Sequence, residues 1–244
     1  MIKLVQFTQL NCCPICDGAQ LESINFRTEL AQNARDCFIF QFNDCICSDC
    51  GYVFSLNRPS NTDLADYYQG YLKSLSNVSE LEIDKRIQIL NPYLRDHSHI
   101  LEIGGGQSGL AKRLTSMEHI VFHEDPSISS EASHNSGFDL ICSYYVGEHV
   151  LDVNEWVAYQ RDLLRSDGHI LIEVPNFARH GLESMNNEHI NHFQMGHLQR
   201  LLIKHGFSII AASESNVGRY FGMWVVGKVN RLGSLPPPPL QVML

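Results

Sequence analysis

Two sets of residues in this chain have the types and spacing that chemistry requires. The first is a pair of C-x2-C sequences at Cys13–Cys16 (CPIC) and Cys47–Cys50 (CSDC). The second is Glu188–Phe193 (EHINHF), where a carboxylate stands beside the first of two histidines. Paired thiolates are typical metal ligands, whereas a carboxylate beside an imidazole suits proton transfer near neutral pH. The two sets therefore predict different tasks for the two ends of the chain.

The overall composition is that of a globular protein. The chain has 244 residues, of which 44% are hydrophobic and 18% charged, and this suits one large domain or a medium domain with a small appendage. Its formal net charge of −9 argues against broad binding of nucleic-acid phosphates, which needs a basic face. No apolar run reaches the roughly 20 residues of a membrane span, and the start of the chain lacks the pattern of a secretory signal. We therefore expect a cytoplasmic protein without a membrane span.

The cysteines are concentrated near the start of the chain. Of the eight cysteines, only Cys142 lies beyond the first 50 residues. In a reducing compartment such a cluster indicates a metal site rather than a set of disulfides. Four thiolates suit the tetrahedral geometry of structural zinc, which leaves no open position for catalysis. Cys12 and Cys45 fall outside the paired spacing, and buried thiols in a small apolar core are the alternative interpretation. The predicted zinc ligands are Cys13, Cys16, Cys47 and Cys50.

Apolar periodicity predicts the elements that position these residues. Strands are expected at His99–Ile103, His119–His123, Phe138–Ser143, His169–Val174, Phe207–Ala211 and Met223–Val229. Helices are expected within residues 61–94 and at Leu110–Thr115, Asn154–Leu164 and Met195–Lys204. Because strands and helices alternate, we predict an α/β fold with a doubly wound, mostly parallel sheet. The expected domains are a zinc-binding segment at 1–60, a helical linker or cap at 61–97, the α/β domain at 98–230 and a proline-rich tail at 231–244.

A glycine-rich turn follows the first predicted strand of the α/β domain, within HILEIGGGQSGL at residues 99–110. Glycines let the backbone bend sharply and approach a ligand closely, and the next helix offers unpaired N–H groups at its start. Gly104, Gly106 and Gly109 also satisfy the dinucleotide fingerprint, with Asp125 as a possible ribose-binding acid. A tight turn without a ligand remains the alternative.

Four motifs in order resemble the landmarks of class I S-adenosylmethionine-dependent methyltransferases. They are LEIGGG at 101–106, EDPS at 124–127, FDLICSYYVGEHV at 138–150 and LLRSDGHILIEVPN at 163–176. The last resembles the leucine-rich passage into the fifth strand of those enzymes, which dehydrogenases lack. The resemblance implies a Rossmann-like methyltransferase sheet behind a small N-terminal zinc ribbon, with S-adenosylmethionine as the cofactor.

The resemblance also implies roles for individual residues. Glu102 would place the methionine moiety, Asp125 would accept hydrogen bonds from both ribose hydroxyls, and Ser143 with Tyr144 would face the sulfonium. Ser108 interrupts the usual glycine spacing, and the segment 128–138 is short where the family places its adenine-binding acid. No adenine contact is therefore named. The cofactor-binding residues that the resemblance implies are Glu102, Gly104, Gly105, Gly106, Asp125, Ser143 and Tyr144.

The order of cysteine pairs, a Tyr-Tyr-x-x-Tyr stretch and the methyltransferase core resembles bacterial methyltransferases of sugar and polysaccharide pathways, including deoxysugar C-methyltransferases. In that group the zinc segment and the tyrosines lie over the mouth of the cofactor site. By this analogy Tyr68 and Tyr71 would contact the substrate or the cofactor. The alternative is an aromatic stripe of a helix that packs against the zinc segment.

The same group carries a Glu-His pair after the fifth strand. The resemblance implies His189 as the general base, with Glu188 orienting it or binding a sugar hydroxyl. A tyrosine is expected two residues before the glutamate, where this chain has Asn186. Two alternatives stay open for His189: contact with the substrate without proton transfer, or bracing of the loop.

Two further histidines bear on this site. Glu148 and His149 form a second acid–histidine pair, and its place after the fourth strand indicates a local turn that frames the cofactor. His192 lies three residues after His189 and could suggest a catalytic metal with it, but this spacing without a further convincing set of carboxylates argues against one.

The leading hypothesis is methyl transfer to a small hydroxylated metabolite, with a nucleotide-linked sugar or a polysaccharide building block favoured. The expected partner is thus a small molecule and not a nucleic acid, and the oligomeric state stays open. Three alternatives share some of the motifs. A catalytically reduced scaffold would use the zinc segment to recruit a partner, a zinc-ribbon RNA methyltransferase is disfavoured by the net charge of −9, and an NAD-dependent dehydrogenase explains only the glycine turn.

Overall fold

The structure is a computed structural model, and it describes most of the chain. The described residues are 1–69, 78–104, 109–124, 136–181, 185, 189–215 and 221–230, with the backbone alone described at 68 and 69.

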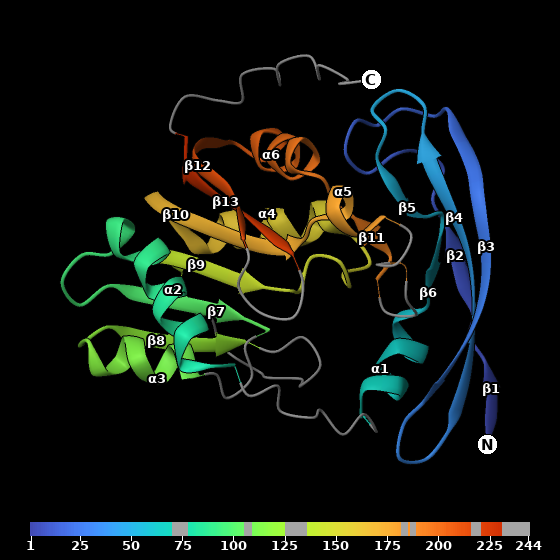
Figure 1. The fold of residues 1–244 in the computed structure, drawn as a ribbon, viewed down its shortest axis with the longest axis horizontal. Helices are drawn as coiled ribbons and strands as arrows, with labels where there is room; N and C mark the ends of the chain where they lie inside the picture. Colours follow the sequence, from blue (N-terminus) through green and yellow to red (C-terminus); the bar gives the residue numbers. More distant parts are fainter. Residues whose placement is uncertain are drawn as a thin grey trace.

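A sheet of six strands, counted over the described residues, forms the centre of the second half of the molecule, in the order β12-β13-β10-β9-β7-β8 (Figure 1). Strands β8, β7, β9 and β10 run parallel, whereas β13 is antiparallel to both β10 and β12. The predicted mostly parallel sheet is confirmed, with β13 as the strand that runs the other way. The strand bounds are β7 (His99–Ile103), β8 (Ile120–Glu124), β9 (Phe138–Tyr144), β10 (Leu164–Pro175), β12 (Phe207–Ser215) and β13 (Gly222–Val229).

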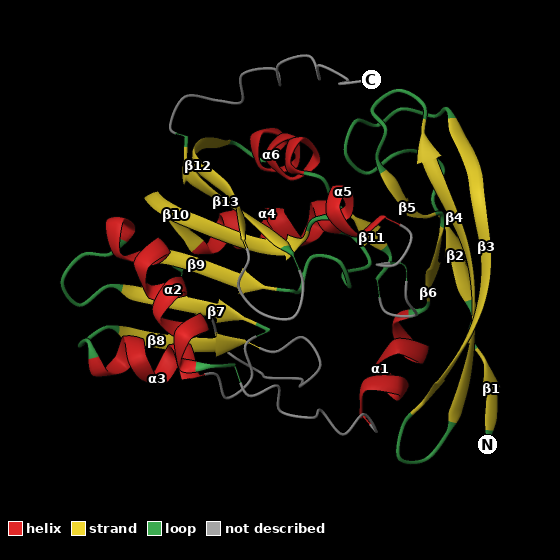
Figure 2. Cartoon of the chain, viewed as in Figure 1, coloured by secondary structure: helices red, strands yellow, loops and turns green. Residues whose placement is uncertain are grey.

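Helices cover both faces of this sheet, as Figure 2 shows. On one face, Leu90 of α2 and Leu114 of α3 share an apolar core with Val226 of β13. On the other face, Val157 of α4 and Leu201 of α6 belong to a second core. The doubly wound architecture follows directly from these two cores. The helix bounds are α1 (Asn61–Gln69), α2 (Glu80–Leu90), the 3-10 helix η1 (Asn91–Tyr93), α3 (Gly109–Ser116), α4 (Val153–Leu163), α5 (Phe177–His180) and α6 (Met195–Lys204).

The N-terminal part is a β-sheet built on a long antiparallel hairpin of β3 and β4. Alternate residues of β4 point inward, and the rings of Phe38 and Phe40 pack against the ring of Tyr67 on α1 at centroid distances of 5.5 and 5.7 Å. This part is larger than the small ribbon expected, because β3 and β4 are 12 and 11 residues long. The strand bounds are β1 (Ile2–Leu4), β2 (Phe7–Gln9), β3 (Leu21–Gln32), β4 (Cys37–Cys47), β5 (Val53–Ser55) and β6 (Asn57–Pro59).

A short strand from the second half of the chain completes the N-terminal sheet. Strand β11 (Asn191–His192) pairs antiparallel with β5, so that Asn191 lies opposite Phe54 and His192 opposite Val53. In Figure 1 the N-terminal sheet stands beyond the ends toward which β7 and β9 point. Residues His189–Phe193 therefore lie where the two parts of the molecule meet.

Most predicted elements are confirmed, with shifts at their ends. Helix α6 has the predicted bounds, whereas β10 already begins at Leu164 and β12 continues to Ser215. The proline-rich tail at 231–244 lies outside the described residues. Among the described residues, no helix has the length and apolar character needed to cross a membrane.

Candidate functional site

The carboxyl ends of the parallel strands meet at one edge of the sheet. Ile103 at the end of β7 lies opposite Ser143 near the end of β9, and Tyr144 lies opposite Glu173 of β10. The next residue after β7, Gly104, has a φ of 78° and donates its N–H to the Glu124 carbonyl oxygen. In doubly wound sheets this edge is where ligands bind.

Gly104 is a position that only glycine fits. Its positive φ disfavours any residue with a Cβ, and a Cβ built there would overlap the Val146 side chain. The turn after β9 thus closes onto the glycine turn after β7. The two turns meet at Gly104 and Val146, and we call this junction the cradle.

Two buried polar groups beside this cradle lack hydrogen-bond partners within the described residues. They are the Ser143 hydroxyl and the Tyr144 hydroxyl. Glu102 is nearby on β7, only 1% exposed, with its Oε2 atom 3.5 Å from Nδ1 of His123. Buried polar groups without partners are uncommon, and at a strand edge they indicate room for a polar ligand.

The ring of Tyr144 packs against Arg86 of α2. The Arg86 guanidinium lies 4.1 Å from the centroid of the Tyr144 ring, and its Nη2 donates to Glu82 Oε1 at 2.8 Å. Arg86 Nε lies 3.7 Å from the Glu173 carboxylate. Burial raises the pKa of Glu173 and opposes its charge, whereas Arg86 lowers that pKa. The predicted cofactor residue Tyr144 therefore stands in a buried, charged environment beneath α2.

Several predicted residues lie outside the described part of the chain. Glu124, the last residue of β8, is described, and its carboxylate accepts a hydrogen bond from the Tyr159 hydroxyl at 3.0 Å. Tyr68 belongs to α1, but its side chain is not described. The predicted residues outside the described ranges are Gly105, Gly106, Asp125, Glu188 and Tyr71.

His189 is buried, with 8% of its surface exposed, and its backbone is anchored from both sides. From the N-terminal sheet, Arg27 Nη2 donates to the His189 carbonyl oxygen at 3.1 Å. Arg58 Nη1 donates to the next carbonyl oxygen, that of Ile190, at 2.9 Å. From the other side, the N–H of Ile190 donates to the carbonyl oxygen of Glu148 at 2.9 Å. The structure thus places His189 against the turn that follows β9.

That turn brings a second acid–histidine pair to His189. The rings of His149 and His189 meet edge to face with centroids 4.9 Å apart. His149 Nε2 lies 3.7 Å from Glu148 Oε1, and Glu148 is 2% exposed. Burial raises the pKa of Glu148 to about 7, while His149 lowers it. The sequence predicts Glu148 and His149 in a local turn, and their contact with His189 is not predicted from it. The repeated Glu-His dipeptide was the signal available in the sequence.

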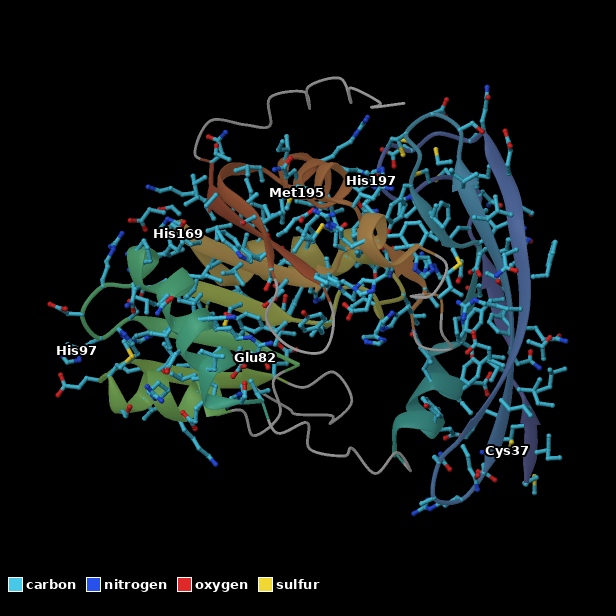
Figure 3. The ribbon with its side chains drawn as sticks, in the orientation of Figure 1. Cys37, Glu82, His97, His169, Met195 and His197 are labelled. Atoms are coloured by element: carbon cyan, nitrogen blue, oxygen red, sulfur yellow. The ribbon has the colours of Figure 1, made fainter. Side chains whose placement is uncertain are left out.

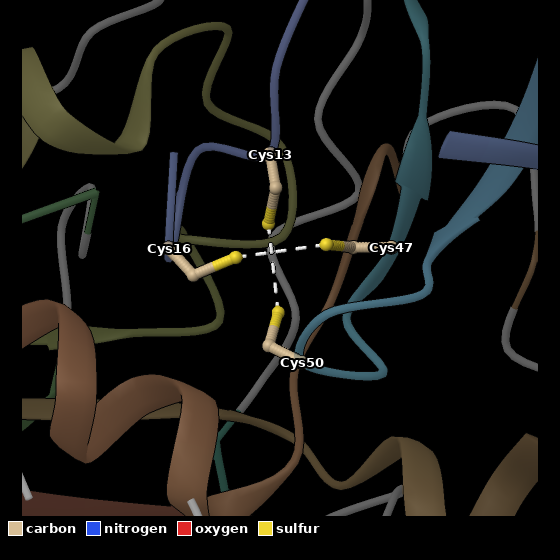
Figure 4. A group of neighbouring side chains, drawn as sticks. All are labelled: Cys13, Cys16, Cys47 and Cys50. Carbon is tan, nitrogen blue, oxygen red and sulfur yellow. Dashed lines mark hydrogen bonds between the residues drawn. The ribbon is translucent and has the colours of Figure 1, made fainter. Parts of the chain in front are cut away.

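The four predicted zinc ligands converge from two loops (Figure 4). Sulfur pairs Cys13–Cys50 and Cys16–Cys47 are each 3.6 Å apart, and all four sulfurs lie within 4.8 Å of one another. A tetrahedron with Zn–S bonds of about 2.3 Å has sulfurs about 3.8 Å apart. The geometry therefore fits a tetrahedral metal ion. Cys12 is exposed and outside the group, and Cys45 is buried but not part of it.

Without a cation, the thiols of Cys13 and Cys16 are difficult to deprotonate. The neighbouring Cys50 sulfur and burial raise the pKa of the Cys13 thiol far above its ordinary value. Burial raises the pKa of Cys16 to about 11. A divalent cation would stabilise the thiolates and remove this cost. His197 of α6 braces the second loop through a contact of 2.9 Å between its Nε2 and the Cys50 carbonyl oxygen, and its position near the loop is visible in Figure 3.

Solved structures with the same fold are methyltransferases. One is the 1,6-didemethyltoxoflavin-N1-methyltransferase of Burkholderia thailandensis with bound 1,6-didemethyltoxoflavin and S-adenosylhomocysteine. Its sequence is 14% identical to this chain, and the TM-score is 0.54. The match covers 75% of this chain and 97% of that one. Another is a chain of the complex between the Haloferax volcanii Trm112 methyltransferase activator and a methyltransferase, 7% identical with a TM-score of 0.50, over 69% of this chain and 95% of that one. A search of the curated proteins found no match.

A protein family described as "Methyltransferase domain" matches residues 76–212 of this chain. The match covers α2 to most of β12, and thus the whole edge that carries Glu102, Gly104 and Ser143. The chain belongs to this family of class I S-adenosylmethionine-dependent methyltransferases and is a methyl-transferring enzyme.

Proposed function

We propose that this methyltransferase acts on a small hydroxylated metabolite, a nucleotide-linked sugar or a polysaccharide building block, and that His189 is its general base. The position of His189 carries the proposal. It is a buried imidazole against the turn that directly follows Ser143 and Tyr144. A hydroxyl acceptor must lose its proton as the methyl moves, and imidazole has a pKa near neutrality that suits this task.

The strand edge fits S-adenosylmethionine. Gly104 has no Cβ at the cradle, where one would overlap Val146, and the unpartnered hydroxyls of Ser143 and Tyr144 belong to the last two residues of β9. S-adenosylmethionine supplies a methyl group that a positively charged sulfur has already activated. In the proposal, Glu102 binds the ammonium group of the methionine moiety, and Asp125 binds the ribose hydroxyls. Gly105 and Gly106 complete the glycine turn.

The chain's own residues then have two tasks. They hold the acceptor oxygen in line with the methyl group, and they remove its proton. His189 receives the proton on a ring nitrogen, with Glu188 as the group that orients it. The backbone contacts from Arg27 and Arg58 restrict where the imidazole can stand. Such restriction matters because displacement of a catalytic group by 1 Å costs about 100-fold in rate.

We propose zinc as the ion of the four-cysteine site, held by Cys13, Cys16, Cys47 and Cys50. The sulfur distances of 3.6 Å support it, and a site of four cysteines has no open position for a substrate. Its role is structural. The second cysteine pair leads directly into β5, and β5 pairs with β11, which follows His189. The zinc site thus supports the strand that fixes the proposed base.

The substrate side of the site is proposed to include Tyr68 and Tyr71. Support comes from their neighbour Tyr67, whose ring packs on Phe38 of the N-terminal sheet. Helix α1 is thereby fixed beside that sheet; Tyr68 is the next residue of α1 after Tyr67, and Tyr71 follows in the sequence two residues after the helix ends. A cytoplasmic location agrees with a nucleotide-linked acceptor, since such compounds are made inside the cell.

The cofactor half of the proposal is tested by calorimetry with S-adenosylhomocysteine. We expect binding at micromolar concentration and a sharp loss of affinity in Asp125→Ala. Absence of heat at millimolar ligand would overturn the assignment of this edge as the cofactor site.

The acceptor half is tested by transfer of labelled methyl to a panel of nucleotide-linked sugars. We expect His189→Gln to lower kcat by about 100-fold or more, the range typical of a general base, with unchanged affinity for S-adenosylhomocysteine. His97→Gln, an exposed histidine at the opposite end of the sheet, is the matched control (Figure 3). Equal kcat in the two variants would remove His189 from the reaction, and methylation of RNA in place of every sugar would overturn the acceptor class.

A further inference from the structure

The cluster of Glu148, His149 and His189 offers one carboxylate and two imidazoles to a common point. Their ligand atoms all lie within 4.8 Å of one another. The cysteine site and this cluster are the groups of metal-ligating side chains found within the described residues. We propose that Glu148, His149 and His189 bind one divalent transition-metal ion, separate from the zinc of the cysteine site.

The ligand set determines the class of ion. Two imidazoles with one carboxylate suit first-row ions such as Fe²⁺, Co²⁺ and Zn²⁺, and they leave coordination positions open for oxygen atoms of a ligand. Bonds of about 2.1 Å place neighbouring ligand atoms roughly 3.0–3.4 Å apart. Since the ligand atoms lie within 4.8 Å of one another, each of their separations must contract by at most about 1.4–1.8 Å. His149 is the half-exposed member, with 26% of its side chain exposed, and can make that movement.

Glu148 supplies an independent reason to expect a cation. Its carboxylate is buried at 2% exposure, and its Oε2 atom has no hydrogen-bond partner within the described residues. A buried carboxylate with an unpartnered oxygen is costly unless a proton or a cation neutralises it. Arg27 and Arg58, which reach the backbone of His189 and Ile190, have side-chain partners of their own: Arg27 Nε donates to Asp44 at 2.7 Å, and Arg58 donates to Asn191. A metal ion would neutralise the Glu148 carboxylate and bind its unpartnered oxygen.

The backbone already holds the two halves of the cluster together. The carbonyl oxygen of Glu148 accepts hydrogen bonds from the N–H groups of Ile190 and Asn191, at 2.9 and 3.1 Å. The Asn191 side chain also donates to the carbonyl oxygens of Gly147 and Val150, at 3.0 and 2.7 Å. These contacts fix the residue after His189 to the turn that carries Glu148. The site is thus largely formed before an ion enters.

This inference rests on the proposed function for the nature of the acceptor, and it changes how His189 serves it. In the cation-free protein, the imidazole of His189 takes the acceptor proton itself. With an ion bound, a ring nitrogen of His189 is a ligand, and the hydroxyl of the acceptor loses its proton to water because coordination lowers its pKa. A vicinal diol, as sugars carry, could fill two open positions of such an ion.

Cobalt(II) is the probe for the site. Zinc-loaded protein is titrated anaerobically with Co²⁺, and its visible absorption and metal content are followed. We expect one added equivalent with a weak visible band and without the strong near-ultraviolet absorption that thiolate ligands cause. Glu148→Gln and His149→Ala should weaken Co²⁺ binding by about 100-fold or more, since changes one shell further out already cost about 10–100-fold. Thermal unfolding of the wild type should shift upward with Co²⁺, and that of the variants should not.

His97→Ala is the matched control, because it removes an exposed imidazole far from the cluster (Figure 3). Wild-type protein that takes up no cobalt beyond the cysteine site would overturn the inference. The same holds if His149→Ala binds cobalt as tightly as His97→Ala does. The cobalt titration and the methyl-transfer assay fail independently. Methyl transfer to a sugar without cobalt binding would overturn the metal site alone. Cobalt binding without methyl transfer to any sugar would overturn the proposed acceptor alone.

Discussion

Arg58 Nη2 donates a hydrogen bond of 2.8 Å to the side-chain oxygen of Asn191, and this contact joins the two parts of the molecule. Both side chains are buried, Arg58 at 3% exposure on β6 and Asn191 at 1% on β11. The amide nitrogen of Asn191 donates in turn to carbonyl oxygens of the turn after β9. One side chain therefore ties the N-terminal sheet to the methyltransferase domain beside His189.

Asn191→Ala should damage both stability and catalysis. The change removes the partner of Arg58 Nη2 and the hydrogen bonds to the carbonyl oxygens of Gly147 and Val150, and each buried group left unsatisfied costs about 1–3 kcal/mol. We expect a lower free energy of unfolding in urea and a lower kcat, with little change in affinity for S-adenosylhomocysteine, because the glycine turn is not touched. Asn25→Ala is the control, since that amide makes one 3.3 Å contact with Asp44 in the same sheet. Equal losses in the two variants would contradict the role given to Asn191.

The cysteine site should control the stability of the N-terminal sheet. Cys16→Ser removes one of four ligands, whereas Cys12→Ser changes an exposed thiol outside the group. We expect about one equivalent of zinc in wild type and in Cys12→Ser, little in Cys16→Ser, and a markedly lower Tm for Cys16→Ser, because metal binding contributes folding free energy directly. Elemental analysis and thermal unfolding measure this. Full zinc content in Cys16→Ser would contradict the assigned ligand.

The parts of the fold that sequence alone predicts are those with local signals. Helix α6 has apolar residues at helical spacing. The spacing of the cysteine pairs indicates a metal-binding group even when the fold is not known. Strand β3 has no such signal, because it lies at the edge of its sheet and exposes Phe26 and Leu30. Strand β11 is too short to be recognised before its partner β5 is known.

The site divides in the same way. Gly104 could be predicted because a strand, a glycine turn and a helix follow one another in the sequence. The contact of His149 with His189 could not, since it depends on the backbone bonds that bring two distant turns together. The secondary-structure propensities of residues do not indicate which distant turns pair, whereas the hydrogen bonds of buried backbone groups in the structure do.

Stability should fall in acid because of His192. This residue is 3% exposed, and burial, together with Arg27 and Arg58, lowers its pKa to about 3 from an ordinary value of 6.5. The folded state keeps His192 neutral while the unfolded state binds a proton below pH 6.5. Its contribution is therefore complete above pH 6.5 and is lost as the pH falls toward 3, by at most about 4–5 kcal/mol. Urea unfolding at several pH values should show a shallower decline for His192→Gln than for wild type, and parallel declines would contradict this assignment.

Gly104→Ala should abolish cofactor binding through steric overlap rather than backbone strain alone. Gly104 and Gly206 have similar φ values of 78° and 81°, so an alanine at either position carries a strain of roughly 1–2 kcal/mol. A Cβ at Gly104 overlaps Val146, whereas at Gly206 the nearest atom, Arg161 Nε, is 3.8 Å away. We expect a larger loss of stability in Gly104→Ala than in Gly206→Ala because of this overlap, with affinity for S-adenosylhomocysteine lost only in Gly104→Ala, as measured by calorimetry. Because Val146 follows Ser143 and Tyr144 on the opposite turn, a second change that shortens it, Val146→Ala, should restore part of the affinity. If Gly206→Ala weakens binding as strongly, the loss reflects general destabilisation and the cradle at Gly104 is not the cofactor site.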